Sequence, residues 1–404
     1  MVATLASAIS PGELGERRRR VLELAAAEGA AGLILWSSAR VFYLSGFAFV
    51  PTERPIALLI SGSGESVLFV PRLELEHAET YAQLDRVVSY PEYPDTRHPL
   101  RRLAELLGEL ELGTGRLAGD SDGYPHIFGY RGPKLSELME VEFVPIGDAI
   151  DDLMMIKSAA EVELVRESAR WASRAHRLLQ DYTRPGLTET QVSARAGIEA
   201  TQELLAEYGD HYRAHAWGSS GPHAGYRGQI GAHGALPHSL ATNASFGAGD
   251  TLVTGASCPM FGYFSELERT MILGEPSAAQ QRYFGHMLAL QELAIDRCRA
   301  GVSCAAVDTA VRDYFDRNGL MPLWRHHSGH AIGILYHEGP FLDIGDETTI
   351  EPGMIFTVEP GLYVEGLGGF RHSDTILVTD GDPEFLTDYP RDLGSLTLPL
   401  DPLD

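Results

Sequence analysis

The sequence contains few cysteines, few basic residues and no long apolar run. Its 404 residues include three cysteines, which form no Cys-x-x-Cys pair, so no disulfide framework is indicated. Lysine and arginine number 32 against 56 aspartates and glutamates, and the net charge of −24 argues against nucleic acid or an anionic membrane as partner. No apolar run could span a bilayer. We therefore expect a cytoplasmic protein.

The N-terminal part also lacks the glycine-rich signatures of nucleotide sites, GxGxxG and the P-loop, so we expect no nucleotide. Apolar runs at 56–60 and 66–70 flank a Gly-Ser-Gly turn and predict a β-hairpin. Helix, strand and loop patterns alternate up to about residue 150. Because 404 residues are many for one domain, we predict two domains, the first being an α/β domain over residues 1–153.

The second predicted domain, residues 154–404, begins with a clear helix start. Ser158 is followed three residues later by Glu161, which is a capping box, and the helix after it extends to about Tyr182. Further helices are predicted over 278–299 and 305–318, with strands within 250–275 and 354–380. Helices packed on one face of a mainly antiparallel sheet predict an α+β domain.

The stretch Gly262–Thr270 carries two carboxylates, Glu266 and Glu268, two residues apart. The stretch is predicted to be a strand, and its period of two places both side chains on one face. Two like charges on one buried face raise each other's pKa. Such a pair is unfavourable unless a metal, a cation or a reaction makes use of it, and the alternative is a solvated strand face.

Four further motifs follow in a fixed order, and with Gly262–Thr270 they resemble one family. The motifs are Ser328–Gly333, His337–Pro340, Thr357–Tyr363 and Gly369–Thr375. Their order and spacing are similar to those of the family of creatinase, prolidase, aminopeptidase P and methionine aminopeptidase. The resemblance covers the C-terminal two-thirds closely and the N-terminal third more loosely. It implies the "pita-bread" fold and a hydrolase that acts on C–N bonds.

Most members of that family hold two metal ions with two Asp, one His and two Glu, and this chain departs from the pattern. The resemblance keeps His330 and Glu359 and replaces the second Asp by Glu266. The first Asp falls on Gly255 or, shifted by one residue, on Thr254, and the last Glu falls on Ser373. The remaining anionic ligands are too few for two ions, so we expect no cofactor. A single weak ion, assisted by His372 or His238, stays open.

Within the family, the site pattern resembles creatinase, a metal-independent member. The resemblance implies that Glu268, Glu359 and His238 are catalytic and that the protein takes a small-molecule substrate. It also implies a homodimer in which Arg54 reaches the partner's pocket and holds a substrate carboxylate. Creatinase has a histidine where this chain has Ser373, so creatine specificity is not implied.

The metal-free reaction can be written with these residues. His238 would take a proton from water and return it to the leaving nitrogen. Glu268 and Glu359 would bind a guanidinium or amidine by charge-assisted hydrogen bonds, or Glu268 would attack the carbon itself. The remaining candidates for substrate binding are Glu266, His330, His337 and Arg371; Arg371 could instead pair with Asp374.

We therefore predict a metal-independent, creatinase-like hydrolase of a guanidino, amidine or amide compound. The first alternative is an Xaa-Pro dipeptidase or aminopeptidase P-type peptidase. The second is a catalytically inactive homologue that binds a small molecule, and the third is a lyase that uses a paired base and acid. Turnover in the presence of a chelator would separate the metal-independent hydrolase from the first two alternatives.

Overall fold

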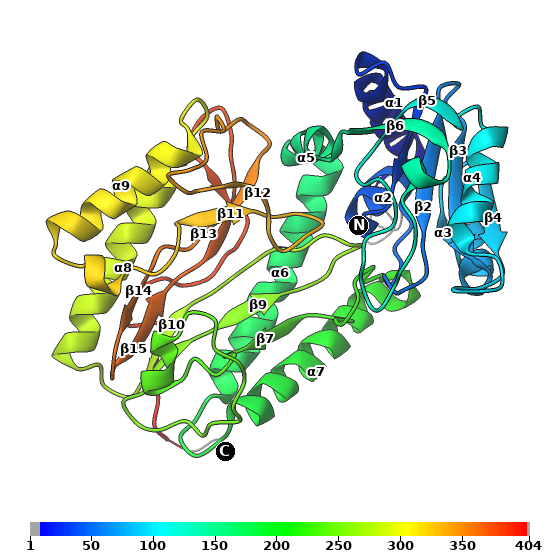
Figure 1. Ribbon diagram of the computed structural model, residues 1–404. Helices are drawn as coiled ribbons and strands as arrows, with labels where there is room; N and C mark the ends of the chain where they lie inside the picture. Colours follow the sequence, from blue (N-terminus) through cyan, green and yellow to red (C-terminus); the bar gives the residue numbers. More distant parts are fainter. Residues whose placement is uncertain (1–8, 402–404) are drawn as a thin grey trace. The chain divides into compact units, whose positions relative to one another are not determined.

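The computed structural model describes residues 9–401 (Figure 1). It divides into two compact units, one over Ile9–Met154 and the other from Met155 onward. Within the described residues, no helix combines the length and the apolar character needed to cross a membrane. The two units are described separately below.

The N-terminal unit is built on a six-stranded mixed sheet. Its strand order is β4-β3-β2-β1-β5-β6. The predicted hairpin is confirmed: β2 and β3 pair antiparallel, with Leu59 opposite Val67. The strands are β1 (Gly32–Leu35), β2 (Ala57–Ser61), β3 (Ser66–Pro71), β4 (Arg86–Tyr90), β5 (Thr114–Gly119) and β6 (Glu140–Pro145), and the helices are α1 (Pro11–Ala27), α2 (Ser38–Ser45), α3 (Leu75–Tyr81), α4 (Pro99–Glu109) and α5 (Gly147–Met155).

Leucines spaced three or four residues apart explain why α4 packs on this sheet. Leu100, Leu103 and Leu107 lie on one face of the helix and are fully buried. They belong to one apolar cluster with Leu59 of β2 and Phe69 of β3. The α/β character predicted for this part of the chain follows from that packing.

The C-terminal unit contains two pairs of long helices with conventional caps. They are α6 (Ala159–Tyr182) with α7 (Glu189–Tyr208), and α8 (Ala278–Arg297) with α9 (Cys304–Arg317). The predicted capping box is confirmed, because the Ser158 hydroxyl accepts from the Glu161 amide while the Glu161 carboxylate accepts from the Ser158 amide. Thr188 caps α7 in the same way, with Gln191 as its partner.

The strands of this unit are short and almost all antiparallel. Helix α6 contacts β7 and β9, whereas α8 contacts β13, β14 and β15, so each helix pair has its own group of strands. The α+β prediction is confirmed. The strands are β7 (His223–Gly225), β8 (Thr251–Val253), β9 (Gly255–Ser257), β10 (Thr270–Leu273), β11 (Gly329–Ala331), β12 (Glu338–Phe341), β13 (Ile355–Val358), β14 (Gly361–Val364), β15 (Gly368–Arg371), β16 (Asp374–Leu377), β17 (Glu384–Phe385) and β18 (Thr397–Leu398).

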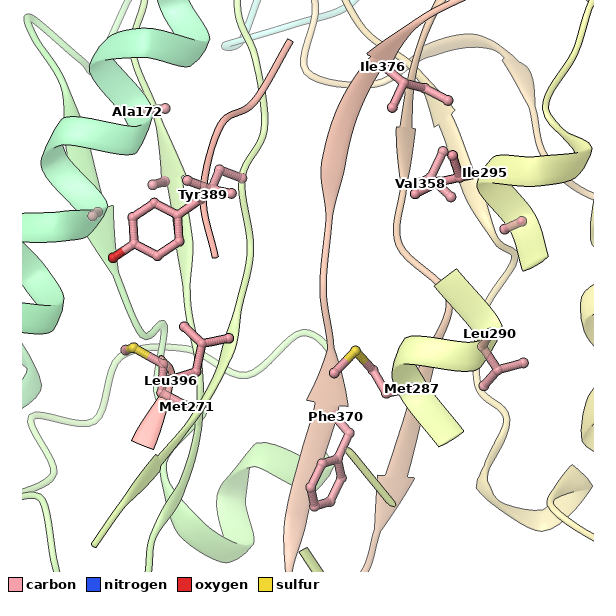
Figure 2. Close-up of a cluster of buried hydrophobic side chains, with 14 of the residues drawn as sticks. Ala172, Met271, Met287, Leu290, Ile295, Val358, Phe370, Ile376, Tyr389 and Leu396 are labelled. Carbon is pink, nitrogen blue, oxygen red and sulfur yellow. The ribbon is translucent and has the colours of Figure 1, made fainter. Parts of the chain in front are cut away.

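One apolar cluster joins both groups of strands to their helices (Figure 2). Ala172 of α6 and Met271 of β10 lie on one side of the view, and Met287 and Leu290 of α8 lie on the other. All four side chains are fully buried. Because buried apolar area supplies most of the favourable folding energy, this cluster holds the two groups of strands in a fixed relation.

The prediction of a continuous strand over Gly262–Thr270 is wrong. Regular pairing begins only at Thr270, in β10. Before it, Leu267 bridges to Ala256 and Glu268 bridges to Ser373, while the Glu266 amide donates to the Thr375 hydroxyl. The backbone is extended, but its hydrogen bonds go to several different segments, so no single ladder forms.

Candidate functional site

Three carboxylates meet where the two groups of strands join. Glu266 and Glu268 come from the extended segment before β10, and Glu359 follows β13. Both Glu266 and Glu268 line one cavity of about 260 Å³. The same-face placement expected from their spacing therefore survives the loss of regular strand pairing. All three residues are buried.

His330 of β11 lies beside Glu359 with its proton position set by the backbone. Its Nδ1–H donates to the carbonyl of Ala331 at 2.9 Å. This leaves Nε2 to face the carboxylates, 3.3 Å from Glu359 Oε1, and Nε2 has no hydrogen bond of good geometry. Nε2 is therefore the ring atom that could bind a metal ion, once the imidazole is in its neutral form.

The pKa values of these groups reflect burial and mutual charge. Burial, and then repulsion from Glu359 and Glu268, raise the pKa of Glu266 to about 8. Burial opposes the protonation of His330, but the nearby carboxylate of Glu359 and the charge of Glu266 raise its pKa to about 9. Burial likewise opposes the ionisation of Glu359, yet His330 and Arg371 hold the pKa of Glu359 well below its usual range.

Glu268 is held between two guanidinium groups. Arg371 of β15 donates to both of its oxygens, through Nε to Oε2 and through Nη2 to Oε1 at 2.8 Å. Arg227 donates from Nη2 to Oε1 at 2.5 Å. The bidentate pair with Arg371 is fully desolvated, since both side chains are buried.

The alternative that Arg371 pairs with Asp374 is wrong. Asp374 instead receives Arg269 Nη2 at 2.8 Å and the Thr387 hydroxyl at 2.7 Å. Arg371 Nη1 donates to the Tyr363 hydroxyl at 3.1 Å. Arg269 lies directly before β10, whereas Arg371 is the last residue of β15. The sequence does not reveal which carboxylate each arginine contacts.

The structure locates both positions at which the family pattern loses a ligand. A Cβ on Gly255 would lie 3.5 Å from Glu268 Oε1, so Gly255 faces the site. The Thr254 hydroxyl points elsewhere: it donates to the Arg269 carbonyl and lies 2.6 Å from His176 Nε2. Ser373 faces the site and donates to Glu266 Oε1 at 2.8 Å.

His372 does not assist at the site. Its Nδ1 accepts from the Thr270 amide at 3.1 Å, and its Nε2–H donates to the Arg391 carbonyl at 3.1 Å. Both ring nitrogens are therefore engaged with backbone. A histidine buried in this way serves the packing between strands, and the suggestion that it could be a metal ligand is wrong.

The residues present fit one divalent ion but not two. Glu266, His330 and Glu359 each offer a ligand atom, and these three atoms lie within 4.8 Å of one another. Two oxygens and one imidazole suit Mn, Fe, Co or Zn. A second ion would need ligands at positions 255 and 373, where the chain has glycine and a serine already bound to Glu266. The Arg371 guanidinium also brings its positive charge to Glu268.

A further histidine, His337, lies near the carboxylates. The ring of His337 stacks on that of His330, with centroids 3.8 Å apart. Burial, and then the positive charge of His330, lower the pKa of His337, and His238 contributes in the same direction. His238 is exposed on the loop that follows residues 231–235, and the catalytic role predicted for it stays a prediction.

Arg54 lies in the N-terminal unit and is paired there. Its Nε donates to Glu92 at 2.6 Å, and Nη1 donates to Glu53 at 2.5 Å. The role predicted for it, in the pocket of a partner subunit, stays a prediction, as does the homodimer.

Sequence reasoning missed Arg227 and Tyr336, which line the cavity together with Glu266 and Glu268. Arg227 lies between Gly225 and Gly228 and has a φ of 52°. An arginine in a glycine-rich loop was the available signal, but only the fold shows that the loop lies against Glu268.

Family models describe almost the whole chain. Residues 163–380 match the model of metallopeptidase family M24, and residues 17–156 match the creatinase/prolidase N-terminal domain. Among curated proteins, the probable dipeptidase PepE of Mycobacterium tuberculosis is 29% identical over 385 residues, which cover 94% of this chain and 96% of that protein.

Solved structures give the same result. Dipeptidase PepE from Mycobacterium ulcerans is 28% identical with a TM-score of 0.80, and the match covers 97% of this chain and 99% of that one. An Xaa-Pro dipeptidase from Bacillus anthracis is 25% identical with a TM-score of 0.78, and the match covers 96% of this chain and 100% of that one.

Proposed function

Because the chain belongs to metallopeptidase family M24, we propose that it is a dipeptidase that hydrolyses the C–N bond of an Xaa-Pro dipeptide or a related small amide. The observation that carries the proposal is the set of Glu266, His330 and Glu359 around one possible ion position, beside a cavity that Glu266 and Glu268 line. The names of the relatives support the substrate class.

One divalent ion bound by these three residues would polarise the substrate carbonyl and lower the pKa of water. The protein's own groups supply the rest. Glu268 is held rigidly by Arg371, so its carboxylate faces the cavity in a fixed orientation. The exposed His238 would deliver a proton to the leaving nitrogen.

The test combines metal analysis with turnover. Purified protein is measured for metal content and then assayed on a panel of Xaa-Pro dipeptides before and after chelation. We expect hydrolysis that falls on chelation and returns when one equivalent of a divalent ion is added. Unchanged turnover in chelator, or no hydrolysis of any dipeptide by metal-loaded protein, would contradict the proposal.

A second candidate is the metal-independent hydrolase of a guanidino or amidine compound. The specific observation in its favour is that Glu268 accepts hydrogen bonds from two guanidinium groups. A carboxylate positioned in this way has the geometry to bind a guanidinium substrate once Arg227 moves aside.

Glu268→Gln tests the second candidate. As a guanidinium-binding or attacking group, Glu268 is essential to the second reaction, so the variant should lose turnover of guanidino substrates entirely. The exposed Glu292→Gln on α8 is the matched control and should leave turnover unchanged. Full activity of Glu268→Gln on either substrate class would remove Glu268 from that mechanism.

A further inference from the structure

The loop between β11 and β12, residues 332–337, carries two side chains that lie at the site. Tyr336 lines the cavity, and the His337 ring stacks on that of His330 with centroids 3.8 Å apart. The pairing of the two strands shifts register between His330 and Ala331. The strand ladder therefore does not by itself determine where the loop lies, and other contacts must place it.

A buried ion pair lies at the base of this loop. Lys157 Nζ donates to Glu338 Oε2 at 2.8 Å, and the two side chains are only 2% and 8% exposed. The other oxygen, Glu338 Oε1, accepts from the amide of Leu335 at 2.9 Å. The carboxylate thus connects Lys157 to the loop. Because a buried charge is costly unless it is paired, the ion pair favours one position of the loop over others.

Lys157 is itself fixed by its backbone. It directly precedes Ser158, the residue that caps the start of α6. Its amide donates to the carbonyl of Gly353 at 2.9 Å, and Gly353 lies two residues before β13, the strand that leads to Glu359. Lys157 therefore joins the start of α6, the approach to β13 and the β11–β12 loop.

Gly333 leaves the space that the ion pair occupies. A Cβ at position 333 would lie 2.8 Å from Lys157 Cε and 2.9 Å from Glu338 Oε2. The Gly333 carbonyl also accepts from the amide of Phe264 at 2.8 Å, and the ring centroid of Phe264 lies 5.2 Å from that of Tyr336. The loop is thus held between the ion pair and the extended segment that precedes β10.

We infer that Lys157 is a positioning residue, whose ion pair with Glu338 keeps Tyr336 and His337 at the cavity. The inference rests on the proposed function for the reaction that the loop serves. Lys157 acts through the loop and not on the substrate. Without its cation, the carboxylate of Glu338 would turn toward solvent to recover hydration. Because Glu338 also holds the Leu335 amide, the loop would move away from the cavity with it.

Spin-label mobility at position 335 tests the inference without turnover. Leu335 is 47% exposed, whereas the three cysteines of the chain are buried, so a nitroxide on Leu335→Cys reports on the loop. We expect restricted motion in labelled protein that keeps the ion pair, and a severalfold shorter rotational correlation time when Lys157→Met or Glu338→Gln is added. Arg174→Met, which breaks an ion pair between α6 and α7, is the matched control and should leave the motion unchanged.

Kinetics of the unlabelled variants, loaded with Mn²⁺, gives the functional readout. In Lys157→Met, kcat/KM on an Xaa-Pro dipeptide should fall about tenfold or more, because displaced groups no longer orient the substrate. The stoichiometry of one Mn²⁺ per chain should persist, since the three ligands of the ion lie outside the loop. Arg174→Met should keep the kcat/KM of the parent.

Unchanged label motion in both Lys157→Met and Glu338→Gln would overturn the inference, as would a kcat/KM equal to that of the parent. Thermal unfolding shows whether each variant is folded, and the nearly isosteric Glu338→Gln serves if Lys157→Met does not fold. Failure of the proposed function is a separate result: the parent would hydrolyse no dipeptide, yet loss of the ion pair would still free the label.

Discussion

At the scale of single residues, the site is a set of charges that compensate one another. Glu268 and Arg371 form a bidentate pair with both side chains buried, and Ser373 donates to Glu266. Each of these contacts satisfies a group that would otherwise be costly to bury. The arginine side chains thus supply positive charge where the family pattern leaves too few anionic ligands for a second ion.

Removing Arg371 should therefore destabilise the protein strongly. Arg371→Gln leaves Glu268 buried with only the half-exposed Arg227 as its charged partner. We expect the free energy of unfolding to fall by about 3 kcal/mol, the typical cost of breaking a buried pair. Urea unfolding measures the change. Arg282→Gln on the surface is the control, and a similar small effect of both substitutions would contradict the prediction.

Two raised pKa values predict how stability depends on pH. The pKa values of Glu266 and His330 are raised to about 8 and about 9, from ordinary values of 4.5 and 6.5. The folded state therefore keeps both protons to higher pH than the unfolded state does, and stability falls as pH rises through these windows. In metal-free protein, we expect the free energy of unfolding to decline from about pH 4.5 to 9.

Glu266→Gln tests the carboxyl part of that pH dependence. The variant cannot lose a proton at position 266, so its stability should decline less between about pH 4.5 and 8. Urea unfolding in chelator at a series of pH values measures both proteins. An unchanged slope in the variant would show that Glu266 does not keep its proton in the folded protein.

At the scale of elements, the strands β11 and β13 position the histidine and a glutamate of the site. They pair antiparallel, with His330 opposite Thr357, and Glu359 follows directly after β13. The pairing brings the backbones unusually close at Gly329, where a Cβ would lie 2.0 Å from the Thr357 carbonyl oxygen. Only glycine fits there without separating the strands.

Gly329→Ala should therefore disturb both stability and the ion site. We expect a loss of about 2 kcal/mol or more from the forced strand displacement, together with weaker metal binding because His330 moves. Gly285→Ala in α8 is the matched control, since its new methyl group meets nothing within 4 Å, and it should be neutral or slightly stabilising. Chemical unfolding and metal titration of both variants test the prediction. Equal effects of the two substitutions on stability and metal binding would contradict it.

At the scale of the whole molecule, the family and the fold are those that the resemblance implied. The prediction of a C–N hydrolase with a pita-bread domain and a creatinase-type N-terminal domain is confirmed by the family models. The comparisons support the peptidase alternative better than the creatinase-like main prediction. Independence of metal, the homodimer and the role of Arg54 stay predictions.

The metal stoichiometry is the measurement that belongs to this scale. We expect titration with Mn²⁺ to saturate at one ion per chain, because the described structure has one group of three suitable ligands. His330→Ala should abolish binding, whereas the double variant Gly255→Asp with Ser373→Glu should be needed before a second ion binds. Two ions bound by the parent would show that ligands from elsewhere complete the site.

The sequence by itself determined the helix starts, the α+β class, the family and most of the residues that gather at the site. Capping and turn signals are local, and the family motifs lie in a recognisable order, so both are visible without coordinates. Only the tertiary structure decided that Gly255 rather than Thr254 faces the site, that Arg371 meets Glu268 rather than Asp374, and that Arg227 enters the cavity. These are contacts between segments far apart in the chain, where small rotations of a backbone select one partner over another, and no local pattern encodes that choice.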